Sequence, residues 1–317
     1  MPQTSISLPE IDQVRVTVIM DNFIDILMAG TEIAQRFPLT ENWADKLLPL
    51  AEHGFSALIQ VKNGDKSGTV VFDTGVSRRG ILNNIDALQI DLQRVQAIVL
   101  SHGHPDHAMG LPGLVDRLGA RGLPLILHPD AFLERKIVLP NGTTLMLPAP
   151  KLKDYRHETI EIIEEVGPSM LVDNMILVSG EVARTSEFEK GFPGHQAKKQ
   201  DLWEPDPLIL DDQCAIMNVR GKGLVIVTGC GHSGIINIIR HAQALTGVQT
   251  IYAVVGGFHL TGALFVPIIA PTIAALEQIK PRFVMPGHCT GWQATHQIAR
   301  AMPEAFIPNA VGTTLAL

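Results

Sequence analysis

Short runs of apolar, largely β-branched residues recur along the chain between polar and turn-forming residues. Such runs are typical of strands buried on both faces of a sheet. They lie at Val14–Met20, Phe55–Val61, Thr69–Phe72, Val95–Leu100, Leu125–His128, Met175–Val178, Cys214–Val219, Leu224–Val227, Ile251–Val255 and Phe283–Met285. Helical spacing of apolar residues predicts helices over Arg79–Leu88, Leu111–Leu118, Ile235–Leu245, Pro267–Ile279 and Gln293–Ala301. Strands that alternate with helices predict an α/β fold.

Two stretches fit this alternation less well. Residues 134–170 carry much of the charge in the middle of the chain, and residues 181–212 are polar and contain several glycines and prolines. They are either solvated surface or excursions that wall a pocket, since long loops in compact domains are often functional. Within the first stretch, we interpret Glu161, Glu164 and Glu165 as the solvated face of a helix.

The composition is that of a globular protein of 317 residues, 46% of them hydrophobic, with a formal net charge of −7. An acidic chain without clustered Lys and Arg is not expected to bind nucleic acid or an anionic membrane. Residues 252–276 are apolar enough to span a bilayer, but their glycine pair and two prolines favour a buried strand, a turn and a helix. The three cysteines show no CxxC spacing and residues 1–13 do not resemble a signal peptide, so we expect a cytoplasmic protein.

The strongest chemical feature follows the predicted strand at Val95–Leu100. A polar turn there presents His102, His104, Asp106 and His107 within six residues. Imidazole nitrogen and carboxylate oxygen suit Zn, Fe(II) or Mn. Alternation directs the first two histidines to one side, while the aspartate and the third histidine reach a second position. We therefore expect a divalent metal site of one or two ions, with Zn as the first choice and Mn or Fe as alternatives.

This His-x-His-x-Asp-His motif resembles the signature of the metallo-β-lactamase fold superfamily. The preceding Phe72-Asp73-Thr74-Gly75 is similar to the first motif of that superfamily, in which the aspartate supports the metal site without ligating it. The segment Pro286-Gly287-His288-Cys289 is similar to its last motif, whose histidine is a metal ligand. The resemblance implies a four-layered αβ/βα sandwich, which we expect to form a single domain over residues 1–317. The stretches near 134–170 and 181–212 would then wall the pocket.

The similarity narrows to one branch of this superfamily. The segments AEHGFSALI at 51–59, TGCGHSGIINIIR at 228–240 and VGGFHL at 255–260 resemble the branch named for the methanopterin-pathway dihydropterin synthase. That enzyme joins a dihydropterin to a ribosyl-aminobenzene phosphate. The resemblance extends roughly from residue 14 to residue 292, and it implies a small-molecule substrate of phosphorylated or pterin-like character.

Two positions depart from the superfamily pattern. Glu181 takes the place of an expected histidine after the strand at Met175–Val178, and it either ligates a metal, orients a ligand or does neither. Cys230 follows Thr-Gly where a metal-bridging aspartate is usual, and it is either a thiolate ligand or a small buried thiol. His232 and His259 are candidates to complete the coordination. Between a sulfur-containing shell and a shell of nitrogen and oxygen alone, we favour the second.

Two glycine-rich turns are candidates for binding an anionic substrate. Gly256, Gly257 and His259 end a predicted strand, where backbone N–H groups can approach an anion; a simple tight turn is the alternative. Ser233 begins the predicted helix at Ile235–Leu245, as its N-cap, as part of an anion site at the helix N-terminus, or as both.

The remaining histidines are assigned mostly to structural roles. We interpret His53 as structural and leave His128 open, because it ends a strand at the same edge as the metal loop. We expect surface positions for four others, and among these His195 merits a test: His157, His195, His241 and His296.

Two classes of function follow. The first is a metal-dependent hydrolase in which Asp106 orients or deprotonates a metal-bound water. In a transferase variant of it, an amine attacks a pterin methylene and diphosphate departs. The second is a non-catalytic or redox metal-binding sensor, since Glu181 and Cys230 in place of the standard ligands could leave a single iron. The sequence leaves open whether the chain forms a homo-oligomer.

Overall fold

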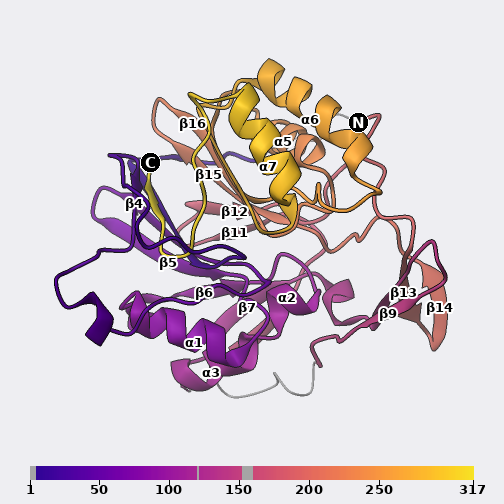
Figure 1. Cartoon of the computed structure of the whole chain (residues 1–317), viewed down its shortest axis with the longest axis horizontal. Coiled ribbons are helices and arrows are strands. Elements are labelled where there is room, and N and C mark those ends of the chain that lie inside the picture. The colour runs from indigo at the N-terminus through magenta and orange to yellow at the C-terminus, as the bar shows by residue number, and fades with distance from the viewer. Residues whose placement is uncertain (1–4, 120, 152–159) are drawn as a thin grey trace.

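The computed structural model describes residues 5–119, 121–151 and 160–317. In these residues the strands form three sheets, of seven, eight and four strands. The two larger sheets pack face to face around a shared core, and helices cover their outer faces (Figure 1). This is the four-layered αβ/βα sandwich that the resemblance implies.

The first large sheet belongs mainly to the second half of the chain. Its strand order is β11-β12-β15-β16-β17-β18, with β1 beside β15. Strands β16, β17 and β18 run parallel, so their carboxyl ends meet at one edge. The bounds are β1 (Glu10–Ile11), β11 (Ser169–Leu171), β12 (Ile176–Val178), β15 (Cys214–Val219), β16 (Gly223–Thr228), β17 (Ile251–Gly257) and β18 (Phe283–Gly287).

The second large sheet is built mainly from the first half. Its order is β10-β7-β6-β5-β4-β2-β19-β3, and the strands β5, β6, β7 and β10 run parallel. The bounds are β2 (Gln13–Met20), β3 (Ala34–Gln35), β4 (Ser56–Asn63), β5 (Lys66–Phe72), β6 (Ala97–Val99), β7 (Leu123–Leu127), β10 (Ile160–Glu164) and β19 (Thr314–Ala316). Because Glu161 and Glu164 lie in strand β10 and Glu165 directly follows it, the interpretation of these glutamates as a helical face is wrong.

Helices lie on the outer faces of both sheets. Two apolar clusters fill the spaces beneath them, one under α1 and α3 and the other under α5, α6 and α7. The bounds are α1 (Arg78–Ala87), α2 (Pro105–Ala108), α3 (Leu111–Leu118), α5 (Ile235–Thr246), α6 (Val266–Ile279) and α7 (Trp292–Ala301), with short 3₁₀ turns η1 (Trp43–Asp45), η2 (Leu92–Arg94), η3 (Pro129–Phe132) and η4 (His288–Thr290). No helix in the described part of the chain has both the length and the apolar character needed to span a bilayer.

The stretches at residues 134–170 and 181–212, which fit the predicted alternation less well, supply the strands of the third sheet. It consists of β8 (Arg135–Val138), β9 (Thr144–Leu147), β13 (His195–Lys199) and β14 (Leu202–Pro205), in the order β14-β13-β8-β9. We call these strands the β-arm, and it projects to one side of the sandwich in Figure 1. Residues 152–159 of the first stretch lie outside the described residues.

Candidate metal centre

Side chains of metal-ligand type gather where strands of both large sheets end. His102 follows β6, and His104 is the residue from which α2 starts, with Pro105 fixing the first helical turn. Cys230 and His232 follow β16, and His288 follows β18. Parallel strands deliver their carboxyl ends to one edge, so residues far apart in sequence meet there.

The first ligand group consists of His102, His104 and His232, whose ligand atoms all lie within 4.8 Å of one another. His232 Nε2 is 3.1 Å from His104 Nδ1, and His102 Nε2 is buried without a hydrogen-bond partner among the described residues. Burial lowers the pKa of all three imidazoles, and neighbouring cationic groups lower it further. The neutral form is the one that ligates metals, so the donor set and the unpartnered nitrogen fit a divalent ion.

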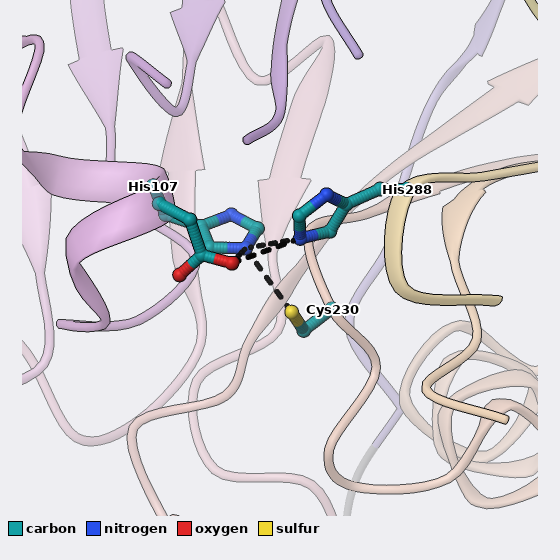
Figure 2. A group of neighbouring side chains, drawn as sticks. His107, Cys230 and His288 are labelled. Carbon is teal, nitrogen blue, oxygen red and sulfur yellow. Dashed lines mark hydrogen bonds and ion pairs between the residues drawn. The ribbon is translucent and has the colours of Figure 1, made fainter. Parts of the chain in front are cut away.

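The second ligand group consists of Asp106, His107, Cys230 and His288. His107 Nε2 lies 3.1 Å from Cys230 Sγ and 3.2 Å from His288 Nε2, and Figure 2 shows these three side chains pointing toward one another. Asp106 Oδ2 is 3.1 Å from His288 Nε2. Burial acts to raise the pKa of Asp106, but His107 and His288 outweigh it and hold this pKa well below the usual range. An ionised carboxylate therefore faces the two imidazoles.

Asp73 positions one imidazole of each group. It follows β5 with a φ of 59°, in the left-handed region, and is fully buried. Its carboxylate accepts from the N–H and the hydroxyl of Ser101, each at 2.7 Å, and Oδ2 lies 2.7 Å from His107 Nδ1. Ser101 Oγ in turn is 2.9 Å from His102 Nδ1. Asp73 thus turns His107 Nε2 toward the second group, in the supporting place that the resemblance implies.

Asp21 and Asn22, which sequence reasoning missed, hold His288. The main-chain N–H of His288 donates to Asp21 Oδ2 at 3.0 Å, and His288 Nδ1 lies 3.0 Å from Asn22 Oδ1. Both residues come directly after the buried strand β2. The sequence signal for Asp21 and Asn22 was a polar pair at the end of a strand. It did not identify their partner His288, which lies more than 260 residues away in sequence.

A third group, Cys230, His259 and Cys289, adjoins the second and shares its thiol. The ring of His259 lies beside that of His232, with centroids 4.1 Å apart and the two planes tilted by 49°. Cys289 Sγ donates to the carbonyl of Cys230 at 3.2 Å. Sequence reasoning placed Cys289 in a motif without assigning it a role.

Glu181 does not join any of these groups among the described residues. Its Oε1 lies 3.1 Å from His128 Nε2, and its side chain is 39% exposed. The third imidazole of the first ligand group is instead that of His232, which follows β16.

The turns expected to bind an anion are largely occupied by the chain itself. The N–H of Gly257 donates to the carbonyl of Gly229 at 2.9 Å, and an added Cβ at Gly256 would lie 1.9 Å from the carbonyl oxygen of Thr228. The N–H of Ser233 donates to Asp212 at 2.8 Å. At the start of α5, the carboxylate of Glu189 accepts from the N–H groups of residues 236 and 237. Close strand packing and these two carboxylates account for the glycines and the helix start. The N-cap of α5 is Gly234, so the expectation that Ser233 caps this helix is wrong.

Two of the four histidines assigned to the surface are buried. His195 is fully enclosed against His104, and His241 on α5 is 8% exposed, so the interpretation of both as surface residues is wrong. His296 is exposed, and His157 lies outside the described residues.

Two cavities border the ligand groups. One, of about 170 Å³, touches the first group at His232 and is also lined by His259, Lys190 and Phe192. The other, of about 680 Å³, touches the second group at His288. Its walls are mostly apolar and include Phe23, Met28, Trp292 and Phe306.

Metal affinity of the second group is expected to rise with pH. Burial acts to lower the pKa of His288, but Cys289 and Asp106 outweigh it and raise this pKa to about 9. A metal must displace that proton, so His288 should make the affinity increase by up to about tenfold per pH unit between pH 6 and 9, above which its contribution ends. Zinc titration against a chelator at several pH values measures this. The first group, with its lowered pKa values, is the internal control and should change little; equal slopes for both groups would contradict the prediction.

Known proteins resemble this chain in both sequence and architecture. Residues 51–243 match the family model of the metallo-beta-lactamase superfamily. The chain is 30% identical over 280 residues to the 7,8-dihydropterin-6-methyl-4-(beta-D-ribofuranosyl)-aminobenzene-5'-phosphate synthase of Methanocaldococcus jannaschii, covering 85% of this chain and 92% of that one. It is 32% identical over 281 residues to an uncharacterised protein of the same organism, covering 88% and 98%.

Solved structures agree with the layered fold. A crystal structure described as a metal-dependent hydrolase of the beta-lactamase superfamily, Tm1679, aligns with a TM-score of 0.71 at 24% identity, covering 95% of this chain and 98% of that one. The metallo-beta-lactamase fold protein YhfI of Bacillus subtilis aligns with a TM-score of 0.53 at 12% identity, covering 96% and 100%. Because the family model matches more than half of this chain, the chain belongs to the metallo-beta-lactamase superfamily.

Proposed function

We propose that this protein is a metal-dependent hydrolase that cleaves a phosphorylated or pterin-like small molecule. The observation that carries the proposal is the adjacency of two ligand groups of different composition. The ring centroids of His102 in the first group and His107 in the second are 4.3 Å apart. Paired metal positions are typical of enzymes that activate water for attack at a phosphoryl or carbonyl centre.

The residues would divide between two metals. The first ion would be held by His102, His104 and His232, and the second by Asp106, His107 and His288 with Cys230 beside them. A bound divalent metal lowers the pKa of a coordinated water towards about 7 and polarises the oxygen of the bond to be cleaved. Zn remains the proposed metal, with Mn and Fe as alternatives.

Asp106 is the proposed catalytic residue. Its carboxylate is ionised and 17% exposed, in contrast to the fully enclosed His107 and His288 beside it. It can therefore accept a hydrogen bond from a water at the mouth of the site and orient that water, while its lowered pKa makes it a weak proton acceptor. His53 Nε2, 3.6 Å from Asp106 Oδ2, lies further out and is 70% exposed.

The cavities suggest how a substrate would lie. The smaller one offers Lys190 and the imidazole of His259 to an anionic group. The larger one offers apolar walls and the exposed ring of Trp292 to a planar or apolar portion. A substrate that reaches both cavities would approach the first ligand group at His232 and the second at His288.

A second candidate is a condensation of the kind named in the Methanocaldococcus relative. The identity of 30% over most of both chains favours it, and two cavities bordering one centre would suit two substrates. In that reaction an amine nitrogen forms a bond to a pterin methylene carbon, the carbon–oxygen bond to diphosphate breaks, and the amine loses a proton. The same metals would then neutralise the departing diphosphate.

One experiment separates these candidates. Zinc-loaded and chelator-stripped protein would be incubated with a dihydropterin diphosphate, with and without an arylamine, and with generic phosphate mono- and diesters. Metal-dependent cleavage without amine supports the hydrolase, and an amine-dependent coupled product supports the condensation. Turnover that is the same before and after metal removal, or in Asp106→Asn, would contradict the proposed role of the centre.

Cys230 is now proposed as a ligand, contrary to the expectation of a sulfur-free shell, because its Sγ lies within the second group. X-ray absorption on the zinc-loaded protein should show a sulfur shell near 2.3 Å. Cys230→Ser should remove that shell. Cys214→Ser is the matched control, since Cys214 is equally buried but contacts Ser179 rather than the centre. A shell of nitrogen and oxygen alone in the parent protein would remove Cys230 from the site.

A further inference from the structure

His195 connects the β-arm to the first ligand group. It begins β13, and its side chain is completely buried. Its Nε2 lies 2.9 Å from Nε2 of His104. The other ring nitrogen of His104, Nδ1, faces His232 at 3.1 Å. His104 therefore directs one nitrogen into the ligand group and the other toward the arm.

Ligation of a metal through Nδ1 of His104 would determine which nitrogen carries each proton. A histidine that ligates a metal through Nδ1 keeps its proton on Nε2 and donates it to a neighbouring acceptor. His195 Nε2 is that acceptor, so the proton of His195 lies on Nδ1. This nitrogen is 2.9 Å from the main-chain oxygen of Asp206 and 3.3 Å from its carboxylate. Each donor in the series His104–His195–Asp206 thus meets an acceptor.

Arg135 at the start of β8 and Asp211 together hold the backbone beside His104. Arg135 makes two hydrogen bonds to the buried carboxylate of Asp211, at 2.6 and 3.0 Å, and its Nε lies 3.5 Å from Asp206 Oδ2. Asp211 Oδ2 also accepts from the N–H of Gly103 at 2.8 Å. Gly103 is the residue between His102 and His104. The ring and the backbone of the metal loop are therefore anchored to one buried network.

We propose that His195 is a positioning residue that holds His104 with Nδ1 toward the first metal, and that the β-arm supports this metal position through it. The inference rests on the proposed role of His104 as a ligand. Ligating histidines usually donate to a carboxylate, a carbonyl or a water. Here the acceptor is a neutral imidazole that is itself held by Asp206, so the arm must be in place for the ligand to be oriented.

The test uses three variants and zinc as the probe. His195→Leu removes the acceptor, and we expect the zinc affinity of the first position to fall by about 10- to 100-fold. His195→Gln keeps an acceptor oxygen for His104 and a donor for Asp206, so it should recover most of the affinity. His241→Leu is the control, because His241 is a buried histidine outside the ligand groups. Chelator competition gives the affinities, and cadmium-113 NMR shows which of the two positions changes.

The outcomes are distinguishable. Wild-type affinity in His195→Leu, or an equal loss in the Leu and Gln variants, would overturn the proposal, the latter by showing that packing alone matters. If His195→Leu does not fold, His195→Asn replaces it, since its shorter amide falls short of His104 and should also weaken the first position. If the parent protein binds no metal at the first position, the proposed function fails, because His104 is then not a ligand.

Discussion

Replacement of His107 by alanine is expected to remove the metal from the second position and to lower turnover by more than about 100-fold. His107 is the one residue of its group that contacts both Cys230 and His288, and its Nδ1 is held by Asp73. Loss of a residue that merely supports a ligand already costs about 10- to 100-fold, so loss of the ligand itself should cost more. His104→Ala should have the same effect on the first position.

Metal content per chain and metal-dependent turnover measure this result. His241→Ala is the control and should retain both. Stability should change less than in proteins folded around a structural zinc, because a chain of this length buries a large core without metal. Full metal content in both His104→Ala and His107→Ala would refute the assignment.

Replacement of Arg135 by methionine is expected to destabilise the protein by about 3–5 kcal/mol. The Arg135 side chain is 2% exposed, and that of its partner Asp211 is fully buried. Methionine fills similar space but leaves a buried carboxylate without its cation, and breaking a buried pair from one side typically costs this much. The N–H of Gly103 would remain the contact that ties Asp211 to the metal loop.

Urea denaturation of the metal-free chains measures the difference in unfolding free energy. Arg117→Met is the matched control, because Arg117 makes a similar paired contact with Asp86 at the surface, where both side chains are over 40% exposed. Exposed pairs contribute less than about 1 kcal/mol. Similar losses in both variants would contradict the structural role given to the buried pair.

The central strands and the long helices could be predicted from sequence. Strands buried on both faces appear as continuous apolar runs, and helices appear as apolar residues at helical spacing. The strand at Cys214–Val219 and the helix at Leu111–Leu118 have the predicted bounds. The strands of the β-arm could not be predicted, since they are short, and β9 and β14 are mostly exposed, so they carry no alternation of buried and exposed positions. The pairing of β8 with β13, which joins the two hairpins of the arm, links segments some 60 residues apart, and no local pattern records it.

The ligands of the metal centre likewise include some that a local sequence pattern predicts and some that only the fold brings together. The ligands that are consecutive in sequence, from His102 to His107, form a recognisable pattern. Which residue completes each group depends on which strand ends lie side by side. Position along the chain made Glu181 a candidate, yet it is His232 that lies with His102 and His104. His195 was assigned to the surface because it lies in a glycine-rich polar stretch, and only the folding of the β-arm onto His104 buries it.

The central claim is that two metals lie side by side at this edge of the sandwich. Crystals of zinc-loaded protein, measured at the zinc absorption edge, test it most directly. The account predicts two anomalous peaks, one among His102, His104 and His232 and the other among Asp106, His107 and His288. A single peak, or peaks away from these residues, would contradict it.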